Sequence, residues 1–116
     1  MTREEVETAA LALPAVTKVV QWGDSDVYKV GGKVFAVCGL GSAMGGGLTF
    51  KVSEIGFMAL TEGGPARQAP YFAKGHWVIV GLADLDAGDL ESWLASSHAL
   101  VAAKLTRVMR RELGLS

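Results

Sequence analysis

The segment that decides the fold is VYKVGGKVFAVC, residues 27–38. Its two β-branched runs flank Gly31 and Gly32, and glycine accepts the positive φ angles of a two-residue hairpin turn. The segment therefore predicts a β-hairpin. Upstream, the β-branched run at 16–22 predicts another strand. Downstream, residues 48–52 alternate apolar and polar side chains, which is typical of a strand with one buried and one solvated face.

Helices are predicted on both sides of these strands. Thr2 and Glu5 have the spacing of a capping box, which starts a helix over about 3–13, and Pro14 ends it. A second, short helix is predicted from its cap at Ser53 through about Leu60.

The rest of the chain predicts a loop at 66–75, a strand at 76–80 and a long helix at about 87–112, which Asp86 caps. The order is then α-β-β-β-β-α-β-α. Consecutive strands with short links imply an antiparallel sheet, so we predict one α+β domain over residues 1–116, with helices packed on one face of the sheet.

Composition narrows the class of protein. The chain has 116 residues, 50% of them apolar and 20% charged, with a net charge of -1, which argues against disorder and against a uniformly basic nucleic-acid binder. A single cysteine, Cys38, excludes a disulfide framework and a multi-cysteine metal site. No apolar run approaches the roughly 20 residues of a membrane span, and the acidic N-terminus is unlike a signal peptide. We therefore expect a cytoplasmic protein without membrane contacts.

The chain lacks the complete sequence motifs that are typical of catalytic and cofactor sites. The glycine-rich segment 39–47 lacks the third glycine of G-x-G-x-x-G and the Gly-Lys-Ser/Thr of a P-loop, and a strand follows it where both motifs need a helix. We interpret it as a flexible hairpin loop. His76 and His98 do not have the spacing of zinc ligands, and Cys38 lies in an apolar alternation typical of the core. We predict no catalytic residue, no metal and no cofactor.

Charge is distributed in blocks that the net charge hides. Residues 84–97 carry four acidic and no basic side chains, whereas residues 98–116 carry four basic and one acidic. Lys29 and Lys33 flank the predicted hairpin tip, where they either contact phosphates as a small wing or keep the sheet edge soluble. A helical stripe of Lys104, Arg107 and Arg111 either grips phosphates or complements the helix dipole.

Several segments, in this order, resemble the MmcQ/YjbR family of small bacterial proteins. They cover nearly the whole chain and comprise residues 12–16, 22–24, 28–36, 48–52, 74–80 and 97–101. The resemblance implies a CyaY-like α+β fold and a "double wing" DNA-binding motif. It matches the hairpin of Lys29 and Lys33 to a wing, and Lys51, Lys74 and His76 fall in matched segments.

These observations lead to a first hypothesis, a non-enzymatic protein that binds double-stranded DNA weakly through phosphate contacts. The predicted contact residues are Lys29, Lys33, Lys51, Lys74, His76, Lys104, Arg107 and Arg111. The alternative is a protein-interaction or small-ligand module, favoured by the near-zero net charge and by the aromatic residues Tyr71, Phe72 and Trp77. An enzyme would require His76, Cys38 or a carboxylate in a shared pocket. Monomer and homodimer both remain open.

Overall fold

The computed structural model describes residues 1–40 and 46–115. The centre of the glycine-rich segment, which the sequence predicts as a hairpin loop, lies outside these residues. The helices are α1 (Arg3–Leu11), α2 (Glu54–Thr61), η2 (Leu82–Asp84, one 3₁₀ turn), α3 (Ala87–Ala102) and α4 (Arg107–Glu112). The strands are β1 (Val16–Gln21), β2 (Ser25–Val30), β3 (Lys33–Leu40), β4 (Gly47–Lys51), β5 (Ala66–Gln68) and β6 (Trp77–Gly81).

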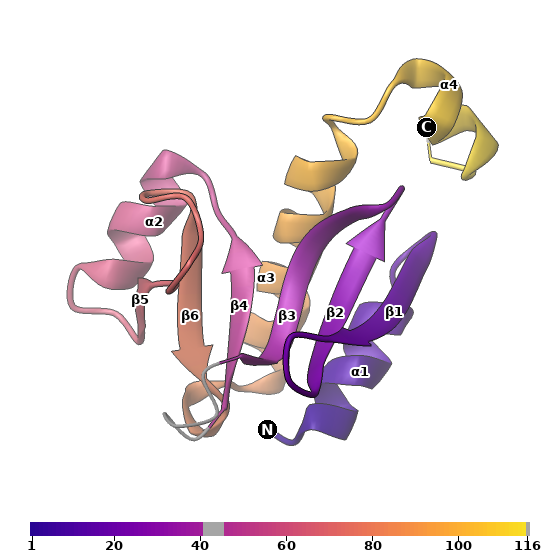
Figure 1. The fold of residues 1–116 in the computed structure, drawn as a ribbon. Helices are drawn as coiled ribbons and strands as arrows, with labels where there is room; N and C mark the ends of the chain where they lie inside the picture. Colours follow the sequence, from indigo (N-terminus) through magenta and orange to yellow (C-terminus); the bar gives the residue numbers. More distant parts are fainter. Residues whose placement is uncertain (41–45, 116) are drawn as a thin grey trace.

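The strands form one sheet in the order β1-β2-β3-β4-β6-β5, and each neighbouring pair is antiparallel. Helices α1 and α3 pack together on one face of the sheet, whereas α2 lies beside β5 and β6 (Figure 1). The predicted α+β architecture, with an antiparallel sheet and helices against it, is confirmed. No helix in the described residues combines the length and apolar character that crossing a membrane requires.

The core lies between the sheet and α3. Its largest fully buried side chains include Tyr28, Phe35, Phe50 and Leu94. The Phe50 ring stacks on Trp93 of α3, with ring centroids 5.5 Å apart. Leu48 and Phe50 enter this core from one face of β4, as the alternation predicts. The prediction of a solvated second face is wrong, because Thr49 on that face is also fully buried.

The structure differs from the predicted secondary structure at three places. The sequence predicts a loop at residues 66–68, but they form β5, with Ala66 opposite Val80. Three residues are too few for an alternation to be recognised. The first helix also ends at Leu11 rather than at 13, because Ala12 is its C-cap.

The predicted long helix at 87–112 is two helices, α3 and α4. Thr106 has an extended backbone, and its hydroxyl accepts from the backbone N–H of Met109, so it caps a new helix. Leu105, in the turn between the helices, is buried against the hairpin glycine Gly31. The sequence pattern places Val108 on the buried face of one long helix, but on α4 it is 62% exposed.

Candidate functional site

The antiparallel topology gathers the basic side chains at one end of the sheet. Lys29 is near the end of β2, Lys33 starts β3, Lys51 ends β4, and Lys74 and His76 precede β6. The ends of β2 and β4 and the starts of β3 and β6 lie at the same end of the sheet, because each strand is antiparallel to its neighbours. The C-terminus of α3 and the helix α4 lie at the same end (Figure 1), and they add Lys104, Arg107 and Arg111. These eight residues are called the basic end below.

Acidic side chains occupy the opposite end. Asp24 is in the β1–β2 turn, Asp84 follows β6, and Asp86 and Asp89 lie at the start of α3. The charge blocks seen along the sequence are therefore also separated in space. The small net charge of -1 therefore hides an excess of positive charge at one end and of negative charge at the other, although Glu54 and Glu112 lie at the basic end.

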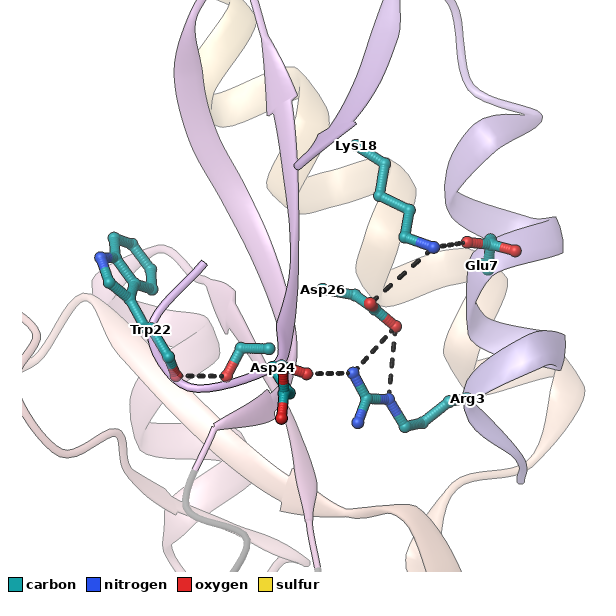
Figure 2. A network of polar contacts seen from close by, with 7 residues as sticks. Arg3, Glu7, Lys18, Trp22, Asp24 and Asp26 are labelled. Atoms are coloured by element: carbon teal, nitrogen blue, oxygen red, sulfur yellow. Dashed lines mark hydrogen bonds and ion pairs between the residues drawn. The ribbon is translucent and has the colours of Figure 1, made fainter. Parts of the chain in front are cut away.

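A polar network at this acidic end connects α1 to the β1–β2 hairpin (Figure 2). The Arg3 guanidinium contacts the Asp26 carboxylate at 3.1 Å and donates to the Asp24 backbone oxygen at 2.6 Å. Lys18 pairs with Glu7 of α1 and lies 3.8 Å from the same Asp26 carboxylate. Each cation here has an acidic partner, so this network is structural.

At the basic end, Lys51 and Lys104 line the same cavity. The neighbouring Lys104 is the largest cause that lowers the pKa of Lys51 to about 8; burial and the charges of Lys104 and Lys33 add to it. Neither Lys51 nor Lys104 has a carboxylate partner in the part of the chain that the structure describes. Closely spaced amines without an internal counter-charge favour a bound anion.

A cavity of about 370 Å³ opens beside this lysine pair. It is lined by Lys51, Lys104 and His76, with Ser53, Glu54 and Trp77 around them. The structure thus brings together three of the predicted contact residues. Trp77, one of the aromatic residues that favour the alternative small-ligand module, also lines this cavity. Ser53 was not predicted for the site, because its helix-cap pattern carries no signal for a ligand.

The remaining predicted residues lie apart from this cavity. Lys29 is half-buried and Lys33 and Lys74 are exposed. Lys104 does not continue a stripe with Arg107 and Arg111, because the break between α3 and α4 separates them. The two arginines instead line another cavity of about 370 Å³ together with Arg110. Arg110 is absent from the predicted set because the predicted stripe assumes one continuous helix.

The β2–β3 hairpin does not project as a free wing. At its tip, Gly31 packs against the side chains of Leu105 and Met109, from the chain around the break between α3 and α4. Lys33 begins β3 after this tip, and its side chain is exposed.

The other groups considered for chemistry have structural surroundings. Cys38 is buried in the core, and burial raises the pKa of its thiol to about 11. The His98 ring contacts Phe35, and its Nε2 is 2.8 Å from the Pro14 oxygen, which can only accept, so Nε2 donates. Within residues 1–40 and 46–115, no three His, Cys, Asp or Glu side chains gather as a metal site would require.

The pKa of Lys51 leads to a prediction about stability. The unfolded chain holds this proton up to the ordinary pKa of 10.5, but the folded protein releases it near 8. Between these values the unfolded chain binds more protons, so the free energy of unfolding should rise as pH rises from about 8 to 10.5. We expect Lys51→Met to remove this rise and to stabilise the protein at pH 7 by about 0.5 kcal/mol, with solvent screening allowed for.

Urea unfolding at pH 7 and pH 10 measures both effects. Lys74→Met is the control, because Lys74 is also an exposed lysine of the basic end but does not line the cavity. An Lys51→Met variant whose pH dependence equals that of the wild type would contradict the prediction.

Comparison with known proteins supports the fold and its classification. The YjbR family model matches residues 11–100. The crystal structure of Deinococcus radiodurans protein DR2400, described as a DUF419 domain, is similar with a TM-score of 0.86 and 26% identity, over 99% of this chain and 89% of that one. A crystal structure of a Pseudomonas syringae protein has a TM-score of 0.69 and 19% identity, over 86% of this chain and 98% of that one. None of the curated proteins matches the chain in sequence.

Proposed function

Because the chain belongs to the YjbR family, we propose that it is a non-enzymatic DNA-binding protein that contacts phosphates of the duplex through its basic end. One observation carries this proposal. All eight residues of the basic end lie at the same end of the sheet, and none of them pairs with a carboxylate in the described chain. A cytoplasmic location, where bacterial DNA is accessible, belongs to the same proposal.

The physical basis is the release of counterions. Cationic side chains without internal partners are neutralised by solvent ions, and the DNA backbone carries its own condensed cations. Both sets of ions are released when lysine and arginine side chains approach phosphates, so binding is favoured at low salt. The acidic end repels the backbone, which leaves one orientation for the protein on DNA. Phosphate contacts fix that orientation without reading sequence.

Fluorescence anisotropy of a labelled DNA duplex, titrated across a salt series, tests the proposal. The logarithm of the affinity should fall linearly with the logarithm of the salt concentration. The double variant Lys33→Gln/Lys104→Gln should bind more weakly. Its salt slope should be smaller by about 1.8, because each lysine that neutralises a phosphate contributes about 0.9 to the slope.

Lys18→Gln is the matched control. It also removes a positive charge, but from a lysine that pairs with Glu7 and Asp26 outside the basic end. We expect its salt slope to equal that of the wild type. Absence of binding at low salt, or equal slopes for the control and the double variant, would refute the proposed interface.

A further inference from the structure

A third cavity, which is largely apolar, lies between α2 and α3. Its volume is about 610 Å³, which falls within the range of small-molecule sites. Phe50 and Trp93, whose rings stack nearly parallel at 15°, line it. Small and apolar side chains form its walls: Gly56, Ala59 and Leu60 from α2, and Ala99, Leu100 and Ala103 from α3 and its C-terminus. This cavity is called the α2–α3 groove below.

Helix α2 is unusually apolar for a helix on the surface. After Glu54 it has no charged residue, yet none of its residues is buried. Ile55 is 81% exposed and Met58 is 56% exposed. Neither of these two side chains lines the α2–α3 groove, whose α2 wall consists of Gly56, Ala59 and Leu60.

The α2–α3 groove continues into the cavity of about 370 Å³ that Lys51, Lys104 and His76 line, which is called the lysine cavity below. Lys51, Val52, Ser53 and Leu100 line both, so the apolar walls and the paired amines of Lys51 and Lys104 adjoin. Glu54 is the acidic residue that lines the lysine cavity, and in the described chain it forms no ion pair with either lysine. The two lysines therefore line this cavity without a carboxylate paired to either of them in the described chain.

We propose that the α2–α3 groove binds a small amphipathic anion, whose apolar body lies between the two helices and whose carboxylate or phosphate group lies between Lys51 and Lys104. The paired charges select the headgroup, because an anion turns the repulsion of two neighbouring amines into two attractions. The apolar walls select the body, because the body covers surface on α2 and α3 that is otherwise exposed to water. This site shares Lys51 and Lys104 with the basic end but requires no DNA, so binding of the anion is measured in the absence of DNA.

Decanoate and decyl phosphate are suitable probes, because they share a chain and differ in the anionic group. Isothermal titration calorimetry should give saturable binding with a Kd below ~1 mM for at least one of them, and the tighter of the two identifies the headgroup. Uncharged decanol should bind at least about tenfold more weakly. Lys51→Gln/Lys104→Gln should lose about tenfold in affinity for the anions, and Lys18→Gln, outside the basic end, should lose none.

A second pair of variants tests the groove itself. Ala99→Trp places a large ring in the groove and should abolish binding, whereas Ala95→Trp lies on an exposed position of the same helix that does not line it and should leave binding unchanged. The amide resonances of Gly56 and Ala59 should shift during titration of the wild type. Circular dichroism establishes that both variants are folded.

Three outcomes would overturn the proposal. The first is no saturable binding of either anion. The second is equal binding of decanol and the anions, or equal binding by the double lysine variant. The third is self-association that shifts the Gly56 and Ala59 resonances with protein concentration, which would make a second copy of the chain the occupant of the groove.

Discussion

Replacing Ser97 by alanine is expected to lower the free energy of unfolding by about 2–4 kcal/mol. The Ser97 hydroxyl is fully buried, donates to the Phe35 backbone oxygen at 2.6 Å and accepts from the Lys51 backbone N–H at 2.9 Å. It therefore joins α3 to two neighbouring strands. Alanine leaves both backbone groups without a partner inside the protein, and each such loss costs about 1–3 kcal/mol.

The neighbouring serine provides the control. Ser96 is on the same helix but exposed, so Ser96→Ala should change the free energy of unfolding by less than about 0.5 kcal/mol. Urea denaturation of the two variants measures the difference. A decrease below about 1 kcal/mol for Ser97→Ala would show that water replaces the hydroxyl and that the bridge contributes little.

Replacing Gly31 by alanine is expected to cost about 2–4 kcal/mol. Gly31 has φ 59° and Gly32 has φ 78°, as the two-residue turn predicted from the sequence requires. A Cβ on Gly31 would lie 2.7 Å from both terminal carbons of Leu105. The variant must therefore bear both the strained backbone and the displacement of a buried leucine.

Gly32→Ala separates these two effects. A Cβ at Gly32 meets nothing within 4 Å. Gly32→Ala should therefore lower the free energy of unfolding only through its positive φ, by about 1–2 kcal/mol. Thermal and urea unfolding of both variants give the contribution of the packing against Leu105 as their difference. Equal destabilisation of the two variants would show that the α3–α4 turn yields to the added methyl group.

The sequence predicted those parts of the fold that depend on local chemistry. The capping box of Thr2 and Glu5 and the glycine pair at the hairpin tip are both present in the structure, because their backbone preferences act within a few residues. The break at 103–106 depends instead on Leu105 packing against Gly31, which is far away in the chain. A continuous apolar periodicity cannot reveal such a contact.

The candidate site could be predicted only in part for the same reason. Lys104 was identified from a helix-end pattern and Lys51 from the resemblance to a family, but their common position follows from the strand order. The cavity that Lys51 and Lys104 line joins β4 to the end of α3, more than fifty residues later in the chain. The α2–α3 groove is equally hidden, because its walls of glycine, alanine and leucine resemble an ordinary helix surface in the sequence.

The separation of the basic and acidic ends has a consequence for the protein in solution. A nearly neutral molecule with opposite charges at its two ends has a large permanent dipole moment, so copies attract one another head to tail. This attraction is strongest near the isoelectric point of about 6.1 and in dilute buffer. Added salt screens it over a Debye length of about 10 Å at 0.1 M. The protein should therefore become more soluble as moderate salt is added, while its proposed affinity for DNA falls.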